Sequence, residues 1–378
     1  MSLRYIVPSL GILACSAGAV QAAEIGSGVT LDGYVDTILE ITSADENALG
    51  FSTNAGGTTP PPGEPEASDT VADFSAGAQL EFGYSIGDVS AKLELYYTAD
   101  RDVDGLDVEQ AWAQWDFKPD QAYFKMGHME VGLGFEATDA PGLYRINTSQ
   151  LRQMLQPQQT TGGSVGFKAN DNFSGAVTLC DGLAQPLPDA WGLDEMDPPS
   201  IGEAAKDNAD IALILQGMYK MEDIGEFEAA LVYDMGAMGA TVDGALEQDD
   251  ALAIDVNGLI TAMEESNLAF GFDLSYWSLG EVTAYGAMAM ANYTFATDTP
   301  MAGTLMLDYV SVDAGDANPG DDDMFNVFEV AAALLTQPTN EENVALNFEL
   351  RYLMRDADAE VEDVDEIGVF VELLAIIP

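Results

Sequence analysis

A serine framed by glycines is the first group in the sequence that could act as a nucleophile. Residues 162–166 read Gly-Gly-Ser-Val-Gly, which matches the letters of a nucleophile elbow around Ser164. That elbow needs a strand before the serine and a helix after it, whereas here a loop sequence precedes and a strand pattern follows. The single histidine, His128, alternates in phase with Phe124 and Met126 and is expected on an outward face. The pair does not predict a catalytic triad, and we expect no enzyme.

An acidic stretch and a lone cysteine are the other groups with chemical potential. Residues 313–323 read DAGDANPGDDD and suit loose binding of a divalent cation, but they lack the later glutamate of an EF-hand loop. A solvated acidic loop is the competing interpretation. Cys180 alternates in phase with polar residues and has no paired histidine, which predicts an inert thiol. No cofactor is expected. The weak metal candidates are Asp313, Asp316, Asp321, Asp322 and Asp323.

Charged residues at every second position point to a third kind of chemistry, the lining of a watery channel. In the segment Val29–Thr42, Asp32, Asp36 and Glu40 fall on the face opposite Leu31, Val35 and Leu39. Burying three carboxylates in a soluble core is expensive, whereas in a membrane barrel that face meets water. The expected lining residues of the whole chain are Asp32, Asp36, Glu40, Glu81, Lys92, Glu94, Lys125, Asp210, Lys220, Asp234, Glu349 and Arg351.

The clearest strand pattern lies in residues 74–99, on both sides of Gly87-Asp88. Apolar and polar residues alternate strictly, which predicts strands with one apolar and one polar face. Gly87-Asp88 suits a two-residue hairpin turn. Such a turn pairs Ile86 with Val89, and in the same register Leu80 with Leu95, so the apolar faces coincide.

The same alternation recurs along the chain and predicts an all-β antiparallel barrel. The expected strands are Val29–Thr42, Phe74–Ile86, Val89–Ala99, Val108–Phe117, Ala122–Met129, Gly163–Lys168, Phe173–Asp181, Ala209–Met221, Phe227–Met235, Leu268–Trp277, Val282–Phe295, Met301–Val312, Met324–Leu335, Val344–Arg355 and Ile367–Ile376. Residues 251–262 fit either a strand or a helical loop segment. Bacterial single-chain barrels have an even number of strands, so including residues 251–262 gives about sixteen and favours the strand.

Long and short connections alternate between these strands. The long segments 44–72, 130–161, 182–208, 236–250, 313–323 and 356–366 all fall on one side, as expected of outer loops, and short periplasmic turns fall on the other. Four of the six carry 23 carboxylates and one basic residue, Lys206. Arg145 and Arg152 lie in the loop after the fifth expected strand. Either that loop folds inward and sets them against acidic residues across a constriction, or it is an ordinary surface loop.

The charge of the chain excludes one class of partner. It carries 12 Lys+Arg against 65 Asp+Glu, a formal net charge of −53, so nucleic acid is excluded. At 47% hydrophobic residues the chain can still fold. The acidity has two interpretations that are compatible: adaptation of a halophilic surface to salt, and attraction of cations.

The first residues predict export. Residues 1–22 join a basic start and a short apolar run to Val20-Gln21-Ala22, as in a signal peptide cleaved after Ala22. Cys15 fits a lipoprotein cleavage box poorly. Residues 23–378 would then form a single barrel domain.

Four short motifs lie in the segment 108–182: Lys125-Met126-Gly127, Gly134-Phe135-Glu136, Tyr144-Arg145 and Gly162-Gly163. With these motifs the segment resembles the OmpL-like β-barrel porins of the porin-2 type. The resemblance implies a bacterial outer-membrane porin for passive diffusion of ions and small hydrophilic solutes. The expected partner is outer-membrane lipid, and an oligomer is compatible with this class of protein. The acidic loops add an expected preference for cations. The alternatives are a structural outer-membrane barrel without a pore and, less favoured, an outer-membrane hydrolase.

Overall fold

The computed structural model describes residues 23–26, 28–44, 70–99, 104–136, 143–157, 159–182, 211–240, 246–263, 267–279, 282–295, 300–313, 324–337, 343–357 and 364–377. The strands are β1 (Ala23–Gly26), β2 (Val29–Ala44), β3 (Thr70–Ile86), β4 (Val89–Ala99), β5 (Asp104–Lys118), β6 (Ala122–Glu130), β7 (Gln159–Lys168), β8 (Phe173–Asp181), β9 (Ile211–Met221), β10 (Gly225–Ala240), β11 (Leu246–Met263), β12 (Leu268–Leu279), β13 (Val282–Phe295), β14 (Met301–Asp313), β15 (Met324–Thr336), β16 (Val344–Ala357) and β17 (Val364–Ile377). One short helix, α1 (Gln150–Leu155), lies between β6 and β7.

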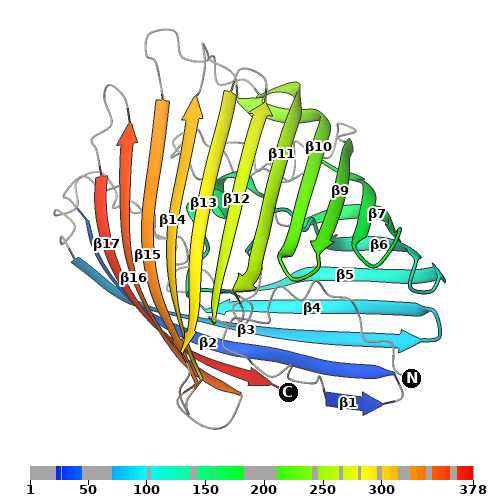
Figure 1. Cartoon of the computed structure of the whole chain (residues 1–378), viewed down its shortest axis with the longest axis horizontal. Helices are drawn as coiled ribbons and strands as arrows, with labels where there is room; N and C mark the ends of the chain where they lie inside the picture. Colours follow the sequence, from blue (N-terminus) through cyan, green and yellow to red (C-terminus); the bar gives the residue numbers. More distant parts are fainter. Residues whose placement is uncertain are drawn as a thin grey trace.

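Strands β2 to β17 form a closed antiparallel barrel of sixteen strands (Figure 1). Each strand pairs with the next along the chain, and β17 returns to β2 with Val371 opposite Leu39. This confirms the expected fold. Residues 251–262 belong to β11, which pairs with β10 on one side and β12 on the other, so the uncertain segment is a strand.

The short strand β1 lies at the seam of the barrel. It pairs with β2 at Val29–Leu31, whereas the pairing of β17 with β2 stops at Gly33. Because β3 occupies the other edge of β2 from Val29 onward, β1 continues the line of β17 along β2. The seam thus gains backbone hydrogen-bonding partners where β17 ends.

The two faces of the barrel wall differ as the alternation predicts. In β3 and β4 the expected register is present, with Ile86 opposite Val89 and Leu80 opposite Leu95. Leu80 is 38% exposed on the outside, while Gln79 is 5% exposed on the inside. Large apolar side chains are exposed on the outer face of most strands. Such a surface is unfavourable in water and suits the hydrocarbon core of a bilayer.

The connections at the two ends of the barrel differ in length. At one end the described links are short, such as residues 87–88, 119–121 and 222–224. At the other end, most of the expected long loops lie outside the described residues. Residues 236–250 depart from expectation because β10 and β11 continue into them, with Ala240 opposite Leu246. No helix in the described part of the chain is long and apolar enough to cross a membrane.

Candidate functional site

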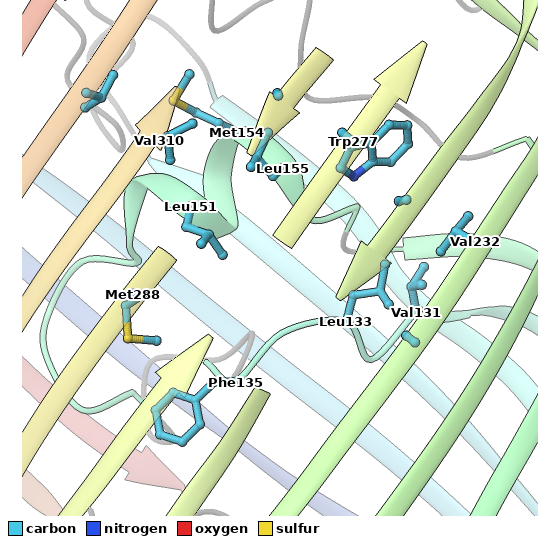
Figure 2. Close-up of a cluster of buried hydrophobic side chains, with 14 of the residues drawn as sticks. Val131, Leu133, Phe135, Leu151, Met154, Leu155, Val232, Trp277, Met288 and Val310 are labelled. Atoms are coloured by element: carbon cyan, nitrogen blue, oxygen red, sulfur yellow. The ribbon is translucent and has the colours of Figure 1, made fainter. Parts of the chain in front are cut away.

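The chain between β6 and β7 turns into the barrel. Its described residues, 131–136 and 143–157, are called the inserted segment below. Leu151, Met154 and Leu155 of α1 are 0–3% exposed and belong to one buried cluster with Trp277 and Val310 of the inner wall (Figure 2). Helix α1 packs against β12, β13 and β14. Of the two alternatives for this loop, the structure has the inward one.

The local sequence explains why a helix forms inside the barrel. Ser149 caps its start, because its Oγ accepts a hydrogen bond of 3.2 Å from the backbone N–H of Arg152. Leu151, Met154 and Leu155 stand three and four residues apart and therefore share one face of the helix. That face packs on Gly286 of β13, where an added Cβ would lie 2.9 Å from Leu151 Cδ1. The missing side chain of the wall makes room for the helix.

Backbone amides of the inserted segment bind carboxylates of the barrel wall. Phe135 N–H donates to Asp273 Oδ2 at 2.8 Å, and Leu151 N–H donates to Asp308 Oδ2 at 2.9 Å. Ile146 N–H and Asn147 N–H both donate to Glu349 Oε2, at 2.8 and 3.1 Å. Buried N–H groups outside regular structure need such acceptors. The wall carboxylates therefore fix the path of the segment.

Two glutamines add to this attachment. The Nε2 atom of Gln156 lies 3.0 Å from Asp255 Oδ2, 2.9 Å from Asp273 Oδ2 and 3.2 Å from Ser275 Oγ. From the wall, Gln216 Nε2 donates to the carbonyl oxygen of Val131 at 2.8 Å. Both ends of the inserted segment are thus held by side-chain amides.

Arg145 and Arg152 make different contacts inside the barrel. The guanidinium of Arg145 pairs with Glu329 and lies 3.5 Å from Glu349. Burial alone would lower the pKa of Arg145, but these two carboxylates raise it, so the group stays charged. Arg152 instead donates to the carbonyl oxygens of Glu136 at 2.7 Å and Leu133 at 3.4 Å. Arg145 thus faces acidic residues of the wall, whereas these bonds of Arg152 brace its own segment.

Glu136 is a buried carboxylate within the inserted segment. It accepts hydrogen bonds from the backbone N–H of Ser149, at 2.9 Å, and from the Ser149 hydroxyl. Burial raises the pKa of its carboxyl group, although Arg145 and the bonds from Ser149 act in the other direction. Glu136 therefore ties the start of the segment to the cap of α1.

A second charged group lies on the wall formed by β2, β3 and β4. In register, Asp32 stands opposite Glu81 and Glu81 opposite Glu94. Lys92 Nζ lies 2.6 Å from Glu81 Oε2 and 2.5 Å from Glu94 Oε2. The side chains of Glu81 and Lys92 are 31% and 17% exposed on the inner face. These four residues are called the β2–β4 cluster below.

Amides and an aromatic ring surround this cluster. Gln79 Nε2 donates to Glu94 and also to Glu109 Oε2, the latter at 3.0 Å, and Gln110 Nε2 donates to Glu94 Oε2 at 2.9 Å. Trp112 Nε1–H donates to Gln110 Oε1 at 3.0 Å, and its ring lies 4.5 Å below Lys125 Nζ. A register shift between β4 and β5 at Glu94 accompanies the inward position of Glu109.

The remaining expected lining residues lie mostly on the inner face. Asp36, Asp234, Glu349 and Arg351 are buried there, at 7%, 0%, 2% and 0% exposure, while Glu40 and Lys125 are half-buried. Arg351 pairs with Glu366 and its guanidinium lies 4.8 Å from the ring of Phe370.

The other expected residues lie at the ends of strands or outside the described part of the chain. Lys220 is near the end of β9, 57% exposed, and 2.6 Å from Glu226. Asp210 lies outside the described residues, as do four of the five metal candidates; the fifth, Asp313, is the exposed last residue of β14. Within the described ranges, no three Asp, Glu, His or Cys residues are grouped around a metal position.

The serine and histidine do not meet. Ser164 faces inward, where its Oγ accepts a hydrogen bond of 2.9 Å from Thr178 Oγ1. His128 faces outward, 3.0 Å from Thr161 Oγ1 and 3.2 Å from Gln159 Oε1. Cys180 is buried on the inner side, as its alternation predicts, and its Sγ lies 3.6 Å from the carbonyl oxygen of Ala212.

Sequence reasoning missed several residues of the site: Asp255, Asp273, Asp308, Glu329 and Glu136. A signal for the wall residues was present. Asp255, for example, stands between Ile254 and Val256 in β11, so alternation in a barrel with an apolar outer face places it on the inner face. The inner wall also departs from the expected polarity. Met288 and Val310 face inward because the inserted segment, rather than water, covers that part of the wall.

Comparison with solved structures gives the class of fold. The outer membrane channel DcaP of Acinetobacter baumannii matches with a TM-score of 0.62 at 12% identity, over 94% of this chain and 99% of that one. OprB of Pseudomonas putida matches with a TM-score of 0.62 at 12% identity, over 92% and 94%. An anion-selective porin from Comamonas acidovorans matches with a TM-score of 0.56 at 11% identity, over 92% and 99%.

The chain therefore has the fold of outer-membrane porin-type barrels. No family model matches it, and no curated protein matches it. These comparisons do not confirm the specific porin-2 resemblance.

Proposed function

We propose that this protein is a bacterial outer-membrane channel for passive diffusion of ions and small hydrophilic solutes, with a preference for cations. The observation that carries the proposal is a closed ring with an apolar outer face and a charged inner wall. Outer-membrane lipid is the partner that this outer face fits.

The inserted segment divides the lumen unequally. It covers the inner faces of β12, β13 and β14, whose residues Met288 and Val310 pack beneath it. Glu81 and Lys92, two charged side chains that retain exposure on the inner face, lie on the β2–β4 side. In our proposal the solute path runs along that side of the barrel.

The pairing of charges supports the preference for cations. Lys92 lies between two carboxylates, Arg145 pairs with Glu329, and Arg351 pairs with Glu366. The basic groups of these pairs are thus compensated locally, whereas the chain carries 65 acidic residues against 12 basic ones. An acidic passage with low-dielectric walls concentrates cations and repels anions.

A structural barrel without a pore is the second candidate. It is favoured by one observation, the apolar packing of the inserted segment against the inner wall. A hydrolase is not favoured, because Ser164 and His128 lie on opposite faces of the sheet. In our proposal the protein is therefore not an enzyme.

Conductance of the purified protein in planar lipid bilayers tests the proposal. We expect stepwise channels whose reversal potential across a KCl gradient shows cation preference, stronger at low salt because salt screens exposed charges. Absence of conductance from folded protein would favour the structural barrel. Anion preference at low salt would mean that the basic residues dominate the path.

A further inference from the structure

We infer that two groups of carboxylates inside this barrel have separate tasks: one positions the inserted segment and sets the pore size, and the other sets ion selectivity. The inference rests on the proposed channel function. The first group, called the positioning acids, is Asp273, Asp308 and Glu349. The second group is the β2–β4 cluster, in which Lys92 is the specificity-determining residue.

The positioning acids are occupied by the protein itself. Asp273, Asp308 and Glu349 are 1%, 1% and 2% exposed. Each accepts at least one backbone N–H of the inserted segment at 2.8–3.1 Å. The segment and its apolar side chains therefore stand between these charges and a solute. Their effect on permeation is indirect, through the path of the segment.

The β2–β4 cluster has the opposite character. Glu81 and Lys92 remain exposed to the lumen, at 31% and 17%. The carboxylates of Asp32, Glu81 and Glu94 lie opposite one another on adjacent strands. In an ordinary sheet, like charges in directly opposite positions repel and are unfavourable. The ammonium of Lys92 compensates two of them, and Lys125 lies over Trp112 instead. The cluster thus keeps a net negative charge beside water.

The position of the Lys92 ammonium group indicates that the cluster can bind a cation. The alkylammonium group is held between Glu81 Oε2 and Glu94 Oε2, so the same oxygens present a place for a permeating monovalent cation. Removing this one side chain leaves three carboxylates without their own counter-charge. A passing cation would then take its place, which makes Lys92 the residue that moderates selectivity.

Two measurements on each variant separate the two tasks. Pore size is measured by the largest polyethylene glycol that enters the open channel and lowers its conductance. Selectivity is measured by the potassium-to-chloride permeability ratio from reversal potentials in dilute KCl. Folding of each variant is checked by its mobility on a denaturing gel before and after boiling.

We expect the Asp308→Asn/Glu349→Gln variant to admit larger polymers with an unchanged permeability ratio. Gly286→Leu, which displaces Leu151 and Leu155 without changing a charge, should do the same and remains informative if the double variant fails to fold.

In the β2–β4 cluster, Glu81→Gln should lower the permeability ratio about threefold, and Lys92→Met should raise it about threefold, as expected for hydrated charges. Neither variant should change the polymer size limit. Asp171→Asn, in the exposed turn after β7, should change neither.

The inference is overturned if the variants of the positioning acids shift the permeability ratio as much as Glu81→Gln does while the size limit stays constant. It is also overturned if Lys92→Met leaves the ratio unchanged. These results differ from failure of the proposed function, in which the wild-type protein would not conduct at all.

Discussion

The ring of Phe135 packs directly on Gly271 of β12. A Cβ at that glycine would lie 2.5 Å from Phe135 Cζ, closer than real contacts allow. The backbone N–H of Phe135 at the same time donates to Asp273, two residues along the same strand. One turn of the inserted segment is thus fixed by a missing side chain and a carboxylate together.

Gly271→Leu should displace the inserted segment while the barrel persists, because the added side chain occupies the position of the Phe135 ring. Arg145 and Arg152 are 2% and 4% exposed, so trypsin cannot reach them in the native protein. We expect rapid tryptic cleavage after one of them in the variant. Gly217→Leu is the control, since the nearest atom to an added Cβ there is 3.8 Å away, on Phe173. Equal resistance of both variants would show that this contact does not hold the segment.

Arg145→Met should destabilise the protein by about 3–5 kcal/mol, because it leaves Glu329 and Glu349 buried without their counter-charge. Urea unfolding in lipid vesicles measures the free energy of unfolding. Adding Glu329→Gln to the variant should recover part of the loss, since it removes one of the two uncompensated charges. No recovery would mean that the cost comes from packing rather than from charge.

Leu80→Arg and Gln79→Arg should differ sharply although the residues are neighbours. Leu80 faces outward, where arginine costs about 2–4 kcal/mol near the middle of a membrane. Gln79 faces inward and donates to Glu94 and Glu109, so an arginine there meets two carboxylates. The yield of folded protein in the outer-membrane fraction measures the difference. Equal losses would contradict the assignment of faces.

The folded barrel should migrate differently on a denaturing gel before and after boiling. The ring closed between β17 and β2 leaves these sixteen strands without an open edge, which resists detergent until heat opens the wall. Identical mobility, or recovery of the protein only from a soluble periplasmic fraction, would be incompatible with a membrane barrel.

The mature protein should begin at Ala23. Val20-Gln21-Ala22 follows a short apolar run, and β1 starts at the residue that cleavage after Ala22 would expose. Amino-terminal sequencing of the purified protein checks this. Recovery of Met1, or of a lipidated Cys15, would contradict it.

The sequence by itself determined most of the strands, the register of the β3–β4 hairpin and the alternation of faces along each strand. Alternation with period two is a local property, so it places Leu80 and Glu81 on opposite faces without knowledge of the fold. In a membrane barrel the apolar Leu80 then faces outward and Glu81 inward. Because bacterial barrels have an even number of strands, residues 251–262 are then predicted to form a strand. In the structure they belong to strand β11. The same alternation places Asp255 on the inner face of β11, but it does not show which groups that carboxylate binds.

Only the tertiary structure decided what those inward residues meet. Arg145 pairs with Glu329, 184 positions away, and Ile146 binds Glu349, 203 positions away. The inserted segment has no strand periodicity. Its path depends on the space that Gly271 and Gly286 leave for its side chains, and on hydrogen-bond acceptors far away in the sequence for its N–H groups. Alternation tells which side of the wall a residue occupies, but it carries no information on whether water or another part of the chain covers that side.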